Sequence, residues 1–342
     1  MSAKPLVSVV IVNRNGAEHL RICLPTLRAQ SYEPIEIIVV DNASSDASAE
    51  VTENAGAQWL RLPSNIGLAP ALNRGAAAAT GELLLFVNND MRFDPDFVAV
   101  LSEVLLKDKS IFAVDGMQFD WEGNRPGHQA TRLAKRGRCS GSAIQIVPGL
   151  YLYQECAAKN TPVLMASAAC MLVRKHIFDS IGRFDERLPL SYEDVEICWR
   201  AWIGGWKTVY APGAICWHRV GSSCRSAEGS RLLFKGILKG RLLLATKALP
   251  LRYALWTWLL STAGVAKDLA RLQWQTARDR LAVLLQYAGY IPQLLREKSA
   301  LFRAAGVTPE QHLESMLRIS YGDQERTQDY GYKVEDQWKR AG

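Results

Sequence analysis

The sequence predicts an α/β fold in which helices cover both faces of a mostly parallel, Rossmann-like sheet, followed by a helical C-terminal extension. Over the first 120 residues, strand-like and helix-like segments alternate, which is typical of parallel strands joined by crossover helices. The strand-like segments, such as "LVSVVIV" (6–12) and "LLLFV" (83–87), are apolar apart from Ser8. Nearly continuous apolar strands are expected where a sheet is buried on both faces.

The elements of this first part follow from the same pattern. Strands are predicted over 6–13, 35–44, 57–62 and about 82–87, and helices over about 17–30 and 67–79. Leu20, Leu24 and Leu27 recur at the spacing of one helix face. Asp94 and Pro95 are expected to be the N-cap and the first residue of the next helix.

The second part of the chain is more varied. Residues 120–162 are basic and are predicted to be largely loop, and 163–174 form an apolar strand or helix. Between 219 and 304, 15 Lys and Arg residues stand against 4 Asp and Glu residues, interleaved with Leu, Trp and Tyr. We therefore expect a larger domain over 1–225 and a basic, amphipathic helical extension with a polar tail over 226–342.

Bulk composition narrows the classes of function. The 342 residues are 48% hydrophobic and carry a net charge of +7, which favours anionic partners such as nucleotides, nucleic acid or anionic lipid. Seven scattered cysteines without a C-x-x-C pair indicate free thiols in a reducing compartment. The N-terminus lacks the pattern of a secretion signal, and the apolar stretch Tyr253–Ala266 is too short to span a bilayer.

Polar side chains stand where three of the predicted strands end. These are Asn13-Arg14-Asn15, Asp41-Asn42 and Asn88-Asn89-Asp90. Ligands of open α/β sheets bind beyond the carboxyl ends of the strands, so we expect a binding site there. No G-x-G-x-x-G follows the first strand and no G-x-x-x-x-G-K is present, which argues against a dinucleotide-binding fold and a P-loop ATPase.

Six segments resemble a bacterial family 2 glycosyltransferase with the GT-A fold, most nearly the rhamnosyltransferase-like group of polysaccharide assembly. They are a first strand ending at Asn13-Arg14-Asn15, then "VVDNASSD", "SNIGLAPALNRG", "GELLLFVNND", "YEDVEICWRA" and "CWHRVGSS". The resemblance covers about 5–225. It implies a nucleotide-sugar half over about 1–120, an acceptor half over about 120–225, and inverting transfer of a sugar to a hydroxyl group.

The resemblance implies a divalent metal, Mg²⁺ or Mn²⁺, at the donor. Asn88-Asn89-Asp90 stands at the family's D-x-D position, which makes Asp90 a metal ligand and places Asn88 and Asn89 at the donor. Asn88 replaces the first Asp of that motif, so one carboxylate stands where the family pattern has two. His218 is expected to reach the metal or the diphosphate. The less favoured alternative is that residues 88–90 form an Asx-turn leading to the next helix.

Further residues resemble those that bind the nucleotide-sugar. Asp41 is expected to contact the base or ribose, with Asn13 and Asn15 as weaker companions, and Arg219 with Ser222-Ser223 to donate to the diphosphate. The segment that resembles the lining of the nucleotide pocket includes Arg61, Asn65, Gly67 and Asn73. Turn or helix-capping roles are the alternatives for Asp41 and Asn15.

"SYED" (191–194) resembles the family's E-D motif, whose Asp is the general base. The resemblance therefore implies that Asp194 deprotonates the acceptor hydroxyl, with Glu193 as the next candidate. The alternative is structural, because Ser191 and Asp194 have the S-x-x-D spacing of a capping box. Trp121 and Trp217 are candidate acceptor contacts, since aromatic faces suit sugar rings.

The basic extension has three interpretations. It could pack on the core as a solvated helical face, dock about 228–304 on an anionic membrane surface, or bind nucleic acid, for which no groove-reading motif is present. Membrane docking is favoured, since it fits a lipid-linked acceptor.

The resulting hypothesis is a metal-dependent inverting glycosyltransferase at the cytoplasmic face of the membrane, with dTDP-rhamnose as the favoured donor. A processive synthase is disfavoured, because the Q-x-x-R-W motif is absent. A sugar nucleotidyltransferase and a catalytically weak nucleotide-sugar-binding subunit are the alternatives.

Overall fold

A computed structural model of the chain describes residues 3–124, 126–135, 143–188, 190–219 and 227–322. The strands are β1 (Val7–Asn13), β2 (Ile35–Asp41), β3 (Gln58–Arg61), β4 (Leu83–Asn88), β5 (Met91–Phe93), β6 (Ile111–Phe119), β7 (Pro126–His128), β8 (Ala130–Lys135), β9 (Ala143–Val147), β10 (Leu150–Glu155), β11 (Thr161–Pro162), β12 (Cys170–Arg174) and β13 (Lys207–His218). The large sheet has the order β11-β13-β6-β12-β4-β1-β2-β3, with β5 beside β13 and β7 beside β6. A separate three-stranded sheet has the order β8-β10-β9.

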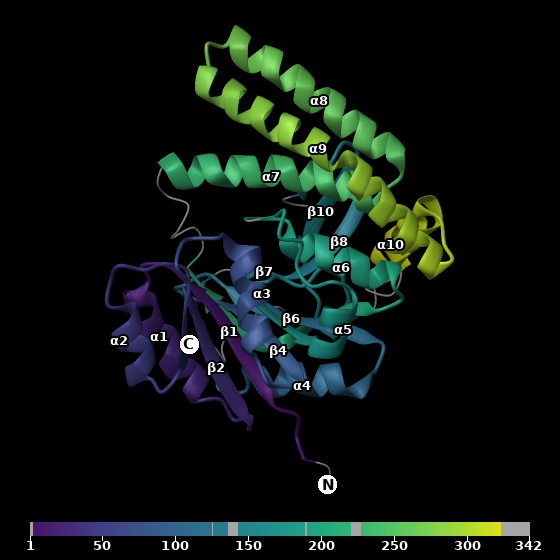
Figure 1. The fold of residues 1–342 in the computed structure, drawn as a ribbon. Coiled ribbons are helices and arrows are strands. Elements are labelled where there is room, and N and C mark those ends of the chain that lie inside the picture. Colours follow the sequence, from purple (N-terminus) through teal and green to yellow (C-terminus); the bar gives the residue numbers. More distant parts are fainter. Residues whose placement is uncertain (1–2, 125, 136–142, 189, 220–226, 323–342) are drawn as a thin grey trace.

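Helices surround the large sheet and make up the C-terminal part (Figure 1). They are α1 (Ala17–Arg28), α2 (Ser48–Asn54), α3 (Leu68–Ala78), α4 (Phe97–Lys107), α5 (Lys175–Ser180), α6 (Glu193–Ile203), α7 (Ala227–Ala248), α8 (Leu251–Ala270), α9 (Trp274–Ala305) and α10 (Pro309–Gly322). Alternate residues of β1 enter two clusters on opposite faces of the sheet. Val9 packs in the cluster with α1 and α4, and Val10 in the cluster with α3, α5 and α6. The predicted sheet with helices on both faces is confirmed.

The parallel strands bring the predicted polar strand ends together. β1 pairs in parallel with β2 and β4, and β2 pairs in parallel with β3. In this register Asn13 lies opposite Asp41, and Val12 lies opposite Asn88. The carboxyl ends of these strands therefore form one polar edge, as their sequence predicted.

Two local predictions were wrong. Asp94 does not cap α4: the helix begins at Phe97 with Asp96 as the N-cap residue, and Asp94 accepts a hydrogen bond from the Asp96 N–H instead (3.1 Å). Much of 120–162 is strand, not loop. β7 adds to the large sheet, and β8, β9 and β10 form the small sheet.

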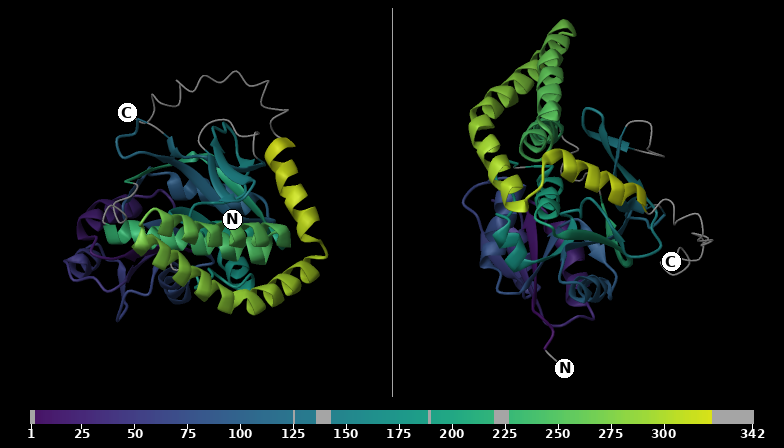
Figure 2. Two further views of the ribbon diagram at one scale, coloured as in Figure 1. Left: turned by 90° about the horizontal axis from the view of Figure 1, so that it is seen from above. Right: turned by 90° about the vertical axis from the view of Figure 1, so that its right-hand side faces the viewer.

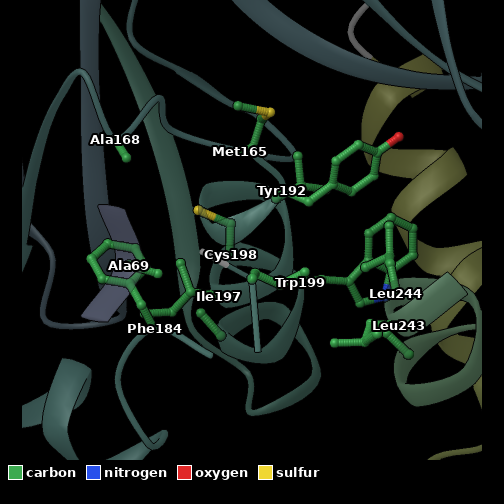
Figure 3. Packing of buried hydrophobic residues seen from close by; sticks show 14 of the residues in the cluster. Ala69, Met165, Ala168, Phe184, Tyr192, Ile197, Cys198, Trp199, Leu243 and Leu244 are labelled. Carbon is green, nitrogen blue, oxygen red and sulfur yellow. The ribbon is translucent and has the colours of Figure 1, made fainter. Parts of the chain in front are cut away.

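The C-terminal helices share a core with the α/β part. One hydrophobic cluster combines sheet residues with residues of α6, α7, α9 and α10. Figure 3 shows Tyr192 and Trp199 near Leu243 and Leu244 in this cluster. α7 lies beyond the carboxyl ends of the strands, and α8 and α9 form a hairpin that projects from the body (Figures 1 and 2). The predicted helical extension is confirmed, and the boundary at 225 stays a prediction.

The sequence predicts free thiols and no apolar stretch long enough to span a bilayer. Five of the seven cysteines are free thiols in the described residues, and Cys139 and Cys224 lie outside this part of the chain. Within the same residues, no helix has the length and apolar character needed to cross a bilayer.

Candidate functional site

Asp90 and His218 meet at the polar edge of the sheet. Asp90 is buried in the turn between β4 and β5, while His218 is the last residue of β13. The His218 Nε2 atom lies 3.2 Å from Asp90 Oδ1 and 3.4 Å from the Asn88 Nδ2 atom. On the other side of the ring, Nδ1 lies 3.2 Å from the Gln118 Oε1 atom. With Nδ1–H donating to Gln118, the Nε2 lone pair faces Asp90, so two metal-binding atoms converge.

Asp90 and His218 alone supply only some of the ligands that a divalent metal needs. A carboxylate oxygen and an imidazole nitrogen are both common ligands of Mn²⁺ and related ions. The described residues hold no group of three or more His, Cys, Asp and Glu side chains that could bind a metal without other ligands. Phosphate oxygens of a donor would therefore have to complete the coordination.

Asn89 and Asn13 are locked together beside this pair. The Asn89 amide donates to the Asn13 Oδ1 atom (2.6 Å), and the Asn13 amide donates to the Ser48 hydroxyl (2.8 Å). A Cβ atom at Gly16 would collide with both asparagine side chains, so a larger residue there would displace this hydrogen-bonded pair. The hydrogen bonds hold the end of β4 against the end of β1.

Asp41 and Asn15 organise the neighbouring loop after β2. Asp41 is buried, and its carboxylate accepts a hydrogen bond from the Ser44 N–H (3.3 Å). Asn15 adopts a positive φ of 50°, and its side chain accepts from the Ser45 N–H (2.8 Å). Turn roles are therefore present for both residues, and nucleotide contact stays a prediction.

The segment with Asn65 and Gly67 is held by Asn42, which was predicted to lie at a strand end but was given no role of its own. The Asn42 amide donates to the Gly67 carbonyl (3.2 Å), and its oxygen accepts from the Ile66 N–H (2.9 Å). Gly67 has a φ of 92°, which favours glycine. Asn65 accepts from the Gly67 N–H (3.1 Å).

Asn73 points away from this group. Its amide donates to the Phe184 carbonyl (2.9 Å), and its oxygen accepts from the Phe184 N–H (3.1 Å). Both polar atoms of this buried side chain therefore hold the loop after α5 against α3, which is a structural role.

A column of alternating indole and guanidinium groups stands beside His218. The Arg92 guanidinium lies 4.7 Å from the Trp217 ring centroid and 5.0 Å from that of Trp121. The exposed Arg219 lies over Trp121 at 4.5 Å, and its N–H donates to the Asp90 carbonyl (3.0 Å). Stacking fixes the Arg219 guanidinium near the predicted metal residues. Ser222 and Ser223 lie outside the described residues.

Glu193 and Asp194 open helix α6. Burial raises the pKa of Glu193 to about 8, and the charge of Asp194 adds to the rise. Burial also raises the pKa of Asp194, but N–H groups of Val195 (2.8 Å) and Ala168 (3.4 Å) donate to its carboxylate and oppose the rise. Near neutral pH, Glu193 therefore holds its proton more readily than Asp194 does.

A short segment connects Asp194 with the end of β4. The Ala168 N–H donates to Asp194, and the carbonyl of Ala169 accepts from the Asn88 N–H (3.0 Å). The predicted base is thus tied through two adjacent residues to the end of β4, two residues before Asp90.

The capping-box alternative for this helix is not realised. Tyr192, not Ser191, is the N-cap residue of α6, and no side chain caps the helix. Ser191 and Tyr192 both have positive φ values, of 69° and 72°.

His128 and Asp115 form a buried pair that the sequence analysis missed. The His128 Nε2 atom lies 2.6 Å from Asp115 Oδ2, and its Nδ1 atom lies 3.0 Å from the Gln154 amide nitrogen. Burial lowers the pKa of His128, but the charge of Asp115, their hydrogen bond and the charge of Asp194 outweigh it and raise the pKa. The positive charge of His128 in turn favours an ionised Asp194.

The fold is that of GT-A glycosyltransferases. A mannosyltransferase from Pyrobaculum calidifontis in complex with GDP-mannose and Mn²⁺ has a TM-score of 0.53 and 16% identity, covering 90% of this chain and 88% of that chain. GalNAc-T7 with UDP, GalNAc and Mn²⁺ has the same TM-score and identity, covering 73% of this chain and 52% of that chain.

The family model for glycosyl transferase family 2 matches residues 8–182, and the chain belongs to this family. It is 25% identical to a Mycobacterium tuberculosis N-acetylglucosaminyl-diphospho-decaprenol L-rhamnosyltransferase, over 66% of this chain and 80% of that protein. It is also 25% identical to the uncharacterised protein y4gI of Sinorhizobium fredii, over 65% of this chain and 25% of that protein. The chain is thus a glycosyltransferase of polysaccharide or glycan biosynthesis.

Proposed function

We propose that the protein transfers a sugar, with inversion, from a nucleotide-diphosphate sugar to a hydroxyl group of a glycan or lipid-linked glycan. The observation that carries this proposal is the link from Asp194 through Ala168 and Ala169 to the end of β4 at Asn88, two residues before Asp90. This link supports a role for Asp194 as the base beside a donor edge that Asn88 and Asn89 would line. Rhamnose from dTDP-rhamnose is the proposed donor, in keeping with the name of the mycobacterial relative.

In the proposed reaction, Asp194 takes the proton of the acceptor hydroxyl as its oxygen bonds to the anomeric carbon. The bond from that carbon to the diphosphate breaks on the opposite face, and the nucleoside diphosphate leaves with the electron pair. Asp194 suits this role because two N–H groups stabilise its charged form. Glu193, with a pKa of about 8, is the second candidate and is largely protonated near pH 7.

Asp90 and His218 would hold a Mg²⁺ or Mn²⁺ ion together with the donor phosphates. When bound, the metal neutralises charge on the departing diphosphate. Arg219 adds a guanidinium to the same group, and its stack on Trp121 keeps it oriented. Asn13, Asn15, Asp41, Asn65 and Gly67 are proposed to line the nucleotide side.

The proposed acceptor is lipid-linked, and the proposed place of the reaction is the cytoplasmic face of the cell membrane. The mycobacterial relative is named for a diphospho-decaprenol acceptor, which supports this choice. Such an acceptor keeps its lipid in the bilayer while the sugar reaches the enzyme.

Calorimetric titration with UDP-, dTDP- and GDP-sugars, with and without Mn²⁺, tests the donor site. We expect one donor to bind in the presence of Mn²⁺, and Asp90→Asn to lower that metal-dependent affinity at least tenfold. Glu103→Gln removes an exposed carboxylate on α4 and should leave the affinity unchanged. Unchanged binding by the Asp90 variant would contradict the metal assignment. Binding without turnover for any acceptor would favour a non-catalytic subunit.

A further inference from the structure

The hairpin of α8 and α9 concentrates the exposed apolar side chains of the molecule. Sixteen large apolar residues are exposed in the described part of the chain, and twelve of them lie between 251 and 295. They are Leu251, Leu255, Trp256, Trp258, Leu259, Leu260, Leu269, Leu272, Trp274, Leu281, Leu285 and Leu295. A cluster of this kind marks an interaction surface.

Most of this surface belongs to the outer side of α8. The buried residues of that helix are small or polar and form a narrow stripe, with Ala254, Thr257 and Ser261 among them. Leu251, Leu255 and Leu259 recur every four residues and share the side away from this stripe. Exposed tryptophans Trp256 and Trp258 flank them, and their rings suit the boundary between water and hydrocarbon.

The exposed side of the hairpin also carries cations, whereas the carboxylates between 251 and 303 are not exposed. Six exposed cations lie between 251 and 303: Arg252, Lys267, Arg271, Arg278, Arg296 and Arg303. Arg278 and Arg296 stand seven residues before and eleven residues after Leu285, so the three share one face of α9. The only carboxylates in this range, those of Asp268, Asp279 and Glu297, are buried or half-buried.

Each of these carboxylates is already paired with a cation. Asp268 pairs with Arg280 at 2.8 Å, Asp279 pairs with Arg231, and Glu297 pairs with Arg187 at 2.7 Å. Of the six exposed cations, Arg252 pairs with the exposed Glu310 of α10 at 3.3 Å. The charge left on the outside of the hairpin by the other five is positive. An apolar strip edged by positive charge complements the surface of an anionic bilayer.

We propose that the outer side of α8, its turn into α9 and the exposed face of α9 form a docking surface for an anionic lipid bilayer. α8 lies in the interface, with its leucines and tryptophans in the headgroup region and its cations beside lipid phosphates. A second copy of the chain fits this surface less well, because self-association would bring the six cations against one another. The proposal does not depend on the sugar that is transferred.

The proposed docking segment is shorter than the predicted segment 228–304. The C-terminal half of α7 is buried, including Leu238 and Leu242–Ala245, so it anchors the hairpin and does not face outward.

Sedimentation of the full chain with vesicles tests this surface without any sugar. We expect binding to vesicles of phosphatidylcholine with phosphatidylglycerol, weaker binding to phosphatidylcholine alone, and weaker binding as salt is raised. Arg278→Gln and Arg296→Gln should each lower the partition coefficient roughly fivefold. Leu255→Ser combined with Leu259→Ser should lower it at least tenfold.

Matched controls are available elsewhere on the surface. Ile22→Ser and Leu106→Ser change side chains of similar exposure on α1 and α4 and should leave vesicle binding unchanged. Light scattering of the free protein reports whether a second copy covers the hairpin. The proposal is overturned if the chain ignores anionic vesicles, if the double leucine variant binds like the parent, or if that variant converts a dimer to a monomer.

Discussion

Two adjacent carboxylates, Glu193 and Asp194, have different surroundings. Asp194 receives two backbone N–H groups, whereas one oxygen of Glu193 is buried without a hydrogen-bond partner. A buried carboxylate without donors holds its proton, so the two side chains are suited to different tasks. In the neighbouring His128–Asp115 pair, the positive charge of His128 favours an ionised Asp194, whereas the charge of Asp115 opposes it.

Replacing Asp194 by Asn is expected to separate binding from transfer. Asparagine keeps the shape of the side chain but cannot accept a proton, so transfer should fall 10²- to 10⁴-fold. Donor affinity, measured by calorimetry, should remain. A variant that no longer folds, judged by circular dichroism, would instead show that the carboxylate is needed for the start of α6.

Glu193 makes the stability of the protein depend on pH. Its pKa is about 8 in the folded protein against an ordinary value of 4.5, so the folded state holds a proton that the unfolded state has lost between these values. The free energy of unfolding should therefore fall as pH rises through this window, by up to about 1.4 kcal/mol per pH unit. Chemical denaturation of Glu193→Gln should show a flatter profile. Glu50→Gln, on the exposed side of α2, should reproduce the parent profile.

At the level of elements, α7 and the loop before α6 approach each other closely. Cβ atoms at Gly236 and Gly240 would collide with the Leu190 carbonyl and the Tyr192 ring, respectively. The Tyr192 hydroxyl also donates to the Ile146 carbonyl, at 3.3 Å. Glycine on α7 thus permits the contact that holds Tyr192, the residue before Glu193, in its left-handed conformation.

Gly240→Ala is expected to disturb the site from outside it. The new methyl group would push Tyr192 away and move the start of α6, which should lower transfer and cost about 1–3 kcal/mol of stability. Gly289→Ala is the matched helical control. Nothing lies within 4 Å of its added Cβ, so it should raise stability by roughly 0.5–1 kcal/mol. Equal effects of the two variants in thermal unfolding and transfer assays would contradict this role of the α7 contact.

The elements that the sequence predicted well are those whose pattern is uniform. β1, β2 and β4 are largely buried and apolar, apart from Ser8, Glu36 and the polar residue at each carboxyl end. β8 was missed because Arg132 lies inside it, buried through an ion pair with Glu155 on β10 (2.7 Å). β7, the strand of His128, was not predicted either. Nothing in the sequence pattern therefore placed His128 beside Asp115.

At the level of the whole molecule, an ion-pair network joins the α/β part to the C-terminal helices. Lys247 on α7 lies 2.7 Å from Glu196, 3.0 Å from Asp185 and 3.5 Å from Glu297. Three cations, Arg187, Arg200 and Lys247, face these three carboxylates. The balanced charges fix α7 and α9 to α6, the helix that begins with Glu193.

Lys247→Met is expected to lower the free energy of unfolding. Three carboxylates would lose a shared, buried partner, which is expected to cost about 3–5 kcal/mol. Lys107→Met breaks an exposed pair with Glu103 on α4 and should leave the stability nearly unchanged. Urea denaturation of both variants measures the difference, and similar midpoints would show that the network contributes little.

The same network has a consequence for the choice of acceptor. Because α9 is bound rigidly to α6, a hairpin resting on a bilayer would hold Asp194, the proposed base, at a constant height above the lipid headgroups. The length of the acceptor glycan would then decide whether it reacts. Acceptors with too few or too many sugars between lipid and reacting hydroxyl would place that hydroxyl below or above the base, so chain length would select the substrate even where the terminal sugar is the same.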